Sequence, residues 1–324
     1  MDSKDRDLAE SHRREARSNK EREDWRMLAE ARQRKLEEAQ TFLESSDVTA
    51  ENDIAEAVSA LNAEIYQVIK RVPEGCRIST GSTVDIVATD RAGTIIGSRM
   101  MDLIRTFPPR GGDWVVMEIA LQATITAYVA RVISSWSPHC SSDEVIDPIY
   151  NRILRSESQS VAGRWRILTR KYVVSSSTSI KDWETRHVRQ LLEDASTILG
   201  ASGAISWDNN DLKDGLEIIV HAAMKIRRMV GEDVVRSEYE VFAVKRKANF
   251  DPDVMVDEYA SPQKRKKKAG VHVICPLTLG LRRREGENRS GTKGRSEVTV
   301  KTLVKPQVVL DTVIDDLGFL DDRE

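Results

Sequence analysis

The stretch Trp114-Val-Val-Met-Glu-Ile-Ala-Leu-Gln-Ala-Thr-Ile-Thr-Ala-Tyr-Val-Ala-Arg-Val-Ile133 decides the fold class of this chain. Fifteen of its 20 residues are apolar, so its length approaches that of a membrane span. Glu118 and Arg131 would each cost roughly 3 kcal/mol at the centre of a bilayer. In addition, Glu118, Gln122 and Thr126 recur every fourth residue, which gives a helix one narrow polar stripe. We therefore expect a buried core helix with one solvent-facing edge.

Helical spacing of apolar residues continues on both sides of this stretch. Between residues 54 and 72 these residues recur every three or four positions, which predicts a helix of five turns. A further helix is expected over 79–107, although its glycines weaken it, and several apolar stripes follow between 143 and 231. The sequence therefore predicts a mainly α fold in which residues 47–233 form an antiparallel multi-helix body of six or seven helices.

The N-terminal segment 1–46 is half charged, with 11 basic and 12 acidic residues, and is rich in good helix formers. We expect a charged N-terminal helical arm that is partly disordered: residues 1–20 frayed and 21–45 helical. Its apolar positions cover about two and a half heptads, whereas a coiled coil needs three or four. Docking on the chain's own domain is thus favoured over a homodimer through residues 25–45, which stays open.

The pattern changes from helical to extended after residue 233. Residues 234–310 contain short runs of β-formers separated by prolines and charges, which indicate a small β element or extended segments laid over the helices. An acidic tail, 311–324, follows, and its charge is opposite to that of the basic loop before it, which suggests the hypothesis that the tail folds back on this loop. The four expected strands lie at 239–244, 271–275, 298–300 and 308–310.

Positive charge is concentrated between residues 261 and 301, which carry 12 basic and 3 acidic groups. Such a run is typical of a nuclear localisation signal or a nucleic-acid patch, but it also occurs as a solvated loop without a partner. No aromatic residues are interleaved with it, so base stacking is not indicated. The Gly-, Arg- and Ser-rich stretch 283–297 is expected to be a mobile loop. The candidate import or polyanion residues are Lys264, Arg265, Lys266, Lys267, Lys268, Arg282, Arg283 and Arg284.

Several classes of protein are disfavoured by composition and by missing motifs. The net charge of −2 excludes attraction of the whole chain to nucleic acid or membranes. Three scattered cysteines without a CxxC pair favour a reducing compartment, and the charged N-terminus lacks the apolar run of a secretory signal. No phosphate-binding, metalloprotease or hydrolase motif is present, and the adjacent pair His139-Cys140 lacks an orienting third group. We therefore assign no catalytic, cofactor-binding or metal-binding residue and expect no cofactor.

Seven short segments between residues 25 and 310 are notable together: Leu61-Asn-Ala-Glu-Ile65, Ile119-Ala-Leu-Gln-Ala123, Val132-Ile-Ser-Ser-Trp-Ser137, Val161-Ala-Gly-Arg-Trp165, Asn249-Phe-Asp-Pro-Asp253, Gly280-Leu-Arg-Arg283 and Val304-Lys-Pro-Gln-Val308. With these segments the chain resembles a family of uncharacterised basidiomycete fungal α-helical proteins. This resemblance implies a shared helical fold and supplies no catalytic residue.

These observations predict an intracellular, non-enzymatic helical protein-interaction module. Two alternatives stay open. One is a nuclear protein that associates with polyanions through the basic run Lys264–Lys268, and the other is an enzyme of unrecognised class. The sequence leaves the choice between nucleus and cytoplasm undecided, and it does not identify a protein partner.

Overall fold

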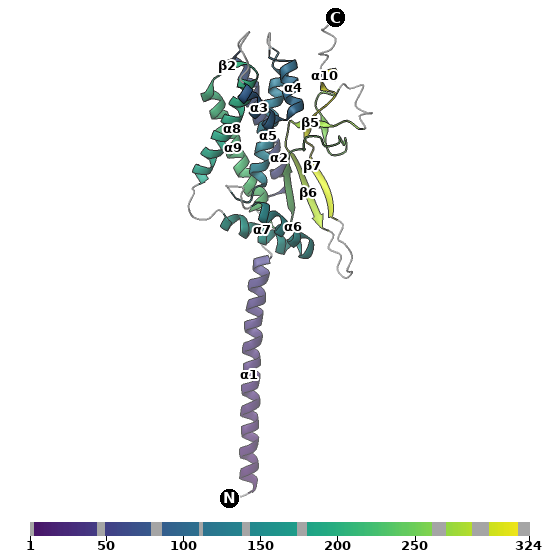
Figure 1. Ribbon diagram of the computed structural model, residues 1–324. Coiled ribbons are helices and arrows are strands. Elements are labelled where there is room, and N and C mark those ends of the chain that lie inside the picture. The colour runs from purple at the N-terminus through teal and green to yellow at the C-terminus, as the bar shows by residue number, and fades with distance from the viewer. Residues whose placement is uncertain are drawn as a thin grey trace. The chain divides into compact units, whose positions relative to one another are not determined.

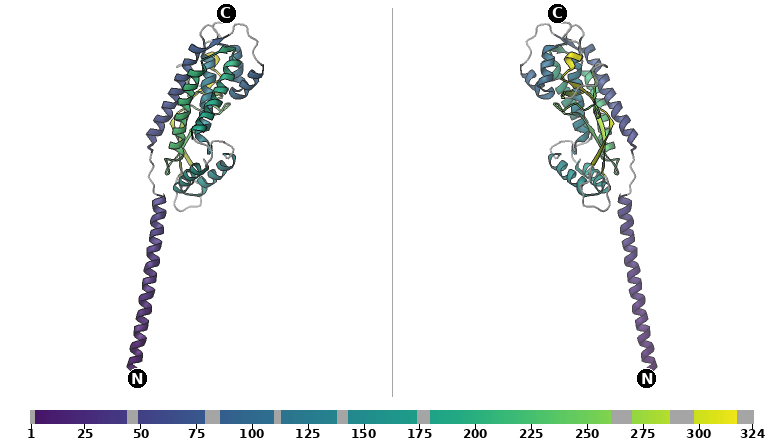
Figure 2. Two further views of the ribbon diagram at one scale, coloured as in Figure 1. Left: turned by 90° about the vertical axis from the view of Figure 1, so that its left-hand side faces the viewer. Right: turned by 90° about the vertical axis from the view of Figure 1, so that its right-hand side faces the viewer.

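The computed structural model is mainly α-helical, as the sequence predicts, and its chain divides into two compact units, 1–46 and 47–324. The first unit is one long helix. In the second, helices are joined to small sheets formed by the C-terminal part of the chain (Figures 1 and 2). The structure describes residues 3–43, 49–78, 86–109, 113–137, 143–173, 180–260, 270–286 and 298–316.

Helix α1 spans Ser3–Leu43, so the expectation of a frayed arm over 1–20 is wrong. Favourable side-chain pairs one turn apart support the early turns, among them Arg14 to Glu10 at 2.9 Å and Arg17 to Glu21 at 3.6 Å. Those of its side chains that the structure describes are exposed, including Trp25 at 68%. Helix α1 is therefore supported by local pairs and helix propensity rather than by a buried face.

Residues 47–233 contain eight described helices, more than the six or seven predicted. One reason is Gly97, whose φ of +88° breaks the helix expected over 79–107 into two. Glycine adopts this conformation without the steric cost that other residues meet. The helices are α2 (Glu51–Gly75), α3 (Ile86–Ile96), α4 (Ser98–Thr106), α5 (Val115–Ser134), α6 (Asp143–Ser156), α7 (Gln159–Val173), α8 (Ile180–Ala201) and α9 (Asn209–Gly231).

Helix α5 is the centre of this unit. It is the one described helix long and apolar enough to cross a membrane, but 78% of its most apolar window is buried inside the protein. It packs against α2, α8, α9 and strand β3 (Glu238–Phe242). The predicted core helix is thus confirmed, since its apolar surface is covered by the chain itself.

The polar stripe of α5 does not face solvent, which corrects the expected wet edge. Gln122 Nε2 and Thr126 Oγ1 both donate to the carbonyl oxygen of Leu277, at 3.1 and 2.8 Å. Glu118 pairs with Lys70 of α2 at 2.5 Å. The stripe therefore binds the backbone of the C-terminal part of the chain, because a buried polar side chain needs a hydrogen-bonding partner.

Two three-stranded sheets follow the helices in the chain. One has the order β3-β6-β7, all antiparallel, and the other the order β4-β8-β5. A two-stranded pair joins β1 (Arg77–Ile78) to β2 (Ala204–Ser206). The four predicted strands are present, but β6 falls where a loop was expected. The remaining elements are β4 (Val256–Asp257), β5 (Val273–Pro276), β6 (Gly280–Gly286), β7 (Val298–Val304), β8 (Gln307–Leu310) and α10 (Val313–Asp316).

The sheet β3-β6-β7 lies along the helices, as Figure 1 shows. Strands β6 and β7 contact α2, whereas β3 contacts α5 and α9. Tyr239 and Val241 point into the core, and Glu240 and Phe242 lie on the other, half-buried face. Among the described strands, β3 pairs only with β6, so its other edge is a free sheet edge that runs beside α5.

Candidate functional site

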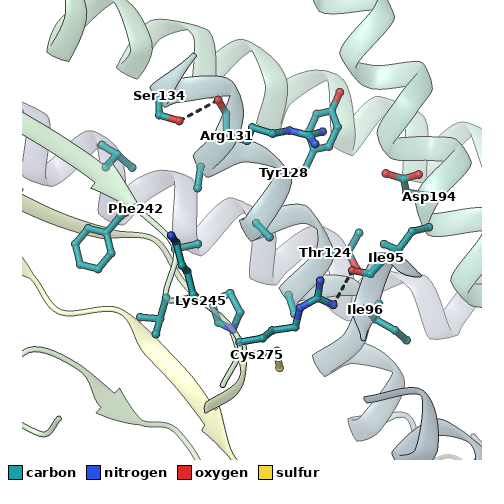
Figure 3. A pocket seen from close by; sticks show the side chains of 18 of the residues that line it. Ile95, Ile96, Thr124, Tyr128, Arg131, Ser134, Asp194, Phe242, Lys245 and Cys275 are labelled. Atoms are coloured by element: carbon teal, nitrogen blue, oxygen red, sulfur yellow. Dashed lines mark hydrogen bonds between the residues drawn. The ribbon is translucent and has the colours of Figure 1, made fainter. Parts of the chain in front are cut away.

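A cleft of about 820 Å³ opens between α5, the end of α3 and the free edge of β3 (Figure 3). Between residues 121 and 134 of α5, the exposed positions are Ala127, Arg131 and Ser134, and all three line this cleft. These positions follow helical spacing, so they form one line along the helix. The cleft is thus where this part of the core helix reaches the surface.

The backbone of β3, and not only its side chains, faces the cleft. Glu240, Val241 and Phe242, the last three residues of β3, all line it, and so do the four residues that follow the strand, from Ala243 to Arg246. Side chains of a strand alternate between its two faces, so a space beside one face would be lined by every second residue. A run of consecutive lining residues indicates instead that the edge of the strand borders the cleft. Unpaired N–H and C=O groups on such an edge are a template for another strand.

A second, smaller cavity of about 230 Å³ continues along the same edge. It is lined by the four consecutive residues from Glu238 to Val241, and it shares Ser134, Glu240 and Val241 with the first. The two cavities together are lined by all five residues of β3, which at about 3.3 Å per residue span roughly 17 Å. Residues 243–246, which follow the strand, continue the lining of the first cavity. We call this space the β3 groove.

Positive charge gathers at the 243–246 end of the β3 groove. Arg246 donates from Nη1 to the Ile95 carbonyl oxygen at 3.0 Å, and the guanidinium of Arg131 lies 4.8 Å from the centroid of the Tyr128 ring. Lys245 is exposed, and neither it nor Arg131 forms an ion pair within the part of the chain that the structure describes. This end of the groove therefore presents cations without bound carboxylates.

The nearest acidic group at that end is Asp194 of α8. Its carboxylate accepts a hydrogen bond from Gln190 Nε2 at 3.0 Å. Burial raises the pKa of Asp194, although this hydrogen bond and the nearby Arg91 and Arg131 act in the opposite direction. Because burial disfavours its charged form, Asp194 offsets the cations of the groove only in part.

The opposite end of the groove is built on buried arginines. Arg166 is 2% exposed; it pairs with Glu238 and also donates to the carbonyl oxygen of Val234. Arg170 donates to the carbonyl oxygens of Ile133 and Ser134, at 3.3 and 3.0 Å. These guanidinium groups satisfy the last carbonyls of α5 and of the segment before β3, which fixes where both run.

A third arginine, Arg227 of α9, completes this cluster. It donates to the carbonyl oxygens of Ser135 and Trp136, at 3.2 and 2.8 Å, and its guanidinium lies 4.8 Å from the centroid of the Trp183 ring. Burial and the neighbouring Arg227 and Arg166 lower the pKa of Arg170 to about 9. The sequence analysis missed the cluster. Its signal in α7 was the spacing of Arg166 and Arg170, which lie one helical turn apart.

A third cavity, of about 410 Å³, adjoins the groove and shares Tyr128, Arg131 and Asp194 with it. In this cavity the Tyr128 hydroxyl lies 2.7 Å from Nδ1 of His187. His187 is 7% exposed, and its Nε2 is buried without a hydrogen-bonding partner in the described structure. Burial lowers the pKa of His187 to about 4, and Arg131, Arg186 and Arg227 contribute in the same direction.

The candidate residues predicted from the sequence are not brought together in the described structure. The run Lys264–Lys268 lies outside the described residues, as does the pair His139-Cys140. Arg282, Arg283 and Arg284 belong to β6 and are not part of a loop.

Each of these three arginines has an acidic partner within the protein. Arg282 contacts Glu240 through two nitrogens, at 3.0 and 2.6 Å, and Arg284 contacts it at 2.5 Å. Arg283 pairs with Glu51 of α2. Their charges therefore fasten β6 to β3 and α2, and hydrogen-bonded pairs of this kind are a structural use of arginine.

The reactive side chains of the described residues do not form a metal-binding cluster. No group of three or more His, Cys, Asp or Glu is arranged there to hold an ion. Cys275 lines the β3 groove, but burial raises its pKa to about 12, so it is held as a neutral thiol at physiological pH. The described groove thus offers hydrogen-bonding backbone, small apolar side chains and cations.

Searches of family models, curated proteins and solved structures find no match to this chain.

Proposed function

We propose that this protein is a non-enzymatic protein-interaction module that binds an extended polypeptide segment in the β3 groove. The supporting observation is that all five residues of β3, a strand with one free edge, line one or both of two cavities that share lining residues. Addition of a strand to such an edge lets main-chain hydrogen bonds supply affinity and alternate side chains supply specificity.

Several small side chains of α5 line the wall of the groove that lies across from β3. Ala123, Ala127 and Ala130 of α5 lie there, together with Thr124 and Ser134. A strand added to β3 would lie about 4.8 Å from it in the hydrogen-bonding direction. Short side chains on the helix leave that space open, whereas longer ones at the same positions would fill it.

Steric block of the groove tests this proposal. Peptides that bind the full chain are selected from a random display library. Their affinities for the unsubstituted protein and for the variants Ala127→Trp and Ala60→Trp are then compared by fluorescence anisotropy. Ala60 is an exposed alanine of α2 outside the groove, which makes it the matched control. We expect Ala127→Trp to lose the selected peptides and Ala60→Trp to keep them. Equal binding by all three proteins would contradict the proposal.

The mode of binding has its own test. Methylation of a peptide amide removes one donor, and in a strand only every second amide faces a given neighbour. Methylation of one alternate set of amides in a selected peptide should abolish binding, and methylation of the other set should preserve it. An equal effect of both sets would indicate that the peptide does not add to β3 as a strand.

A second candidate function rests on the charge of the chain between 261 and 301. We propose that the run Lys264–Lys268 directs nuclear import or contact with a polyanion, because such a cluster repels itself and stays solvated. This proposal is supported by the sequence alone, as are the relation to the basidiomycete family and an intracellular location.

A further inference from the structure

We infer that the segment bound in the β3 groove carries acidic side chains where it passes residues 243–246. This inference rests on the proposed function and adds the chemical class of the partner: an extended segment of another protein with Asp or Glu at one end of its binding motif. The argument starts from the distribution of charge along the groove.

The two ends of the groove differ in the balance of their charges. At the 238–241 end, Glu238 pairs with Arg166, and Glu240 lies against Arg282 and Arg284. Charges there are largely matched within the protein. A ligand that passes this end meets paired groups, so it gains little from charges of its own.

At the other end, cations outnumber the acidic groups that could neutralise them. Arg131, Lys245 and Arg246 line the cleft, against Asp194, whose pKa is raised by burial. Arg246 is held by the carbonyl oxygen of Ile95, a neutral partner, so its charge is retained. Carboxylates of a bound segment would neutralise these cations. Complementary charge of this kind favours an acidic partner and disfavours a basic one.

The adjoining cavity extends the same electrostatic field. Arg131 lines both spaces, and Arg186 lines the second together with His187. Burial is the largest cause of the low pKa of His187, and Arg131, Arg186 and Arg227 lower it further, as a positive local potential would. An acidic side chain bound near Arg131 would reduce that potential, so the pKa of His187 should rise when an acidic ligand is present.

Charge variants of one peptide test the inference. A peptide selected on the full chain is prepared with glutamate, glutamine or lysine at its acidic positions, and each form is titrated by fluorescence anisotropy at low and high salt. We expect the glutamate form to bind about tenfold tighter than the glutamine form at low salt, as two exposed ion pairs would supply. The lysine form should bind weakest, and added salt should reduce the differences.

Substitutions in the protein separate this inference from the proposed function. Lys245→Gln and Arg131→Gln should each lower the ratio of the affinities for the glutamate and glutamine peptides. Lys225→Gln, at an exposed lysine of α9 outside the groove, should leave the affinities for both peptides unchanged. Equal binding of the glutamate and glutamine forms would overturn the inference alone. Failure of every peptide to bind would overturn the proposed function and this inference with it.

Discussion

Glu238, the first residue of β3, forms an ion pair with Arg166 of α7 that is almost completely removed from solvent: the two side chains are 13% and 3% exposed. Glu238→Gln should therefore lower the free energy of unfolding by about 3 kcal/mol, because it leaves the charge of Arg166 buried without its partner. Glu240→Gln is the control, since its side chain is 30% exposed. Urea denaturation measures the free energy of unfolding of both variants, and an equal loss in the two would contradict the prediction.

Gly163 of α7 permits a close approach of the segment that leads into β3. A Cβ at this position would lie 2.0 Å from the carbonyl oxygen of Val235, so the backbone would have to move. Gly163→Ala should be strongly destabilising and lower the melting temperature. Gly93→Ala, in α3 with no atom within 4 Å of the added Cβ, should raise stability by up to about 1 kcal/mol. If the two variants behave alike, the close approach is not maintained in solution.

His187 should make stability depend on pH. Its folded-state pKa of about 4 lies below the ordinary value of 6.5, so the unfolded chain binds the proton more readily. The resulting stability is complete above pH 6.5 and is lost as pH falls toward 4, by about 2 kcal/mol or more. In denaturation curves measured across this window, His187→Gln should flatten the dependence. His221→Gln, at a side chain that is 77% exposed, should leave it unchanged; a similar flattening there would argue against His187 as the source.

Helix α1 gives the homodimer proposal a direct test. Leu28 and Leu36 are exposed large apolar side chains within residues 25–45, at 41% and 59%. If this stretch pairs with a second copy, sedimentation equilibrium of the full chain should show a dimer, and Leu36→Glu should shift it to monomer because it places charge at the interface. A monomer at every concentration of the unsubstituted protein would rule the dimer out.

The basic run is tested by the distribution of a tagged protein in cells. Replacement of all five basic residues by alanine should abolish nuclear accumulation, because recognition of such a run depends on its clustered charge. Lys225→Ala serves as the control for loss of an exposed lysine elsewhere. Nuclear accumulation that survives the five substitutions would remove the import proposal. The residues replaced are Lys264, Arg265, Lys266, Lys267 and Lys268.

Much of the helical architecture could be predicted from the sequence because each helix carries its own periodic stripe. Of the residues that the spacing assigns to a core face, those from Ile54 to Val68 are buried and Val72 is half-buried. A stripe of this kind depends only on neighbours along the chain. Local spacing is therefore a sufficient signal.

The groove could not be predicted in the same way because its walls are far apart in the sequence. The second half of β6 lies in the stretch 283–297, whose glycines, arginines and serines predict a loop. The acidic partners of its arginines, Glu240 and Glu51, are revealed only by the fold. Ala127 gives no sign in the sequence that it is exposed beside a strand edge. Contacts between distant parts of the chain decide both that β6 is a strand and that Ala127 is exposed. In β6 these contacts override the local preference of polar residues for loops.

Asn62 of α2 holds Leu279 by two hydrogen bonds, one to its carbonyl oxygen at 3.0 Å and one from its amide at 2.8 Å, across 217 positions of sequence. During synthesis on the ribosome, α2 emerges long before this partner exists. The nascent protein must then carry an unfinished interior until residue 279 has been made, and closure over so long a loop delays folding. Chaperones that shield apolar surfaces would meet this chain at that stage.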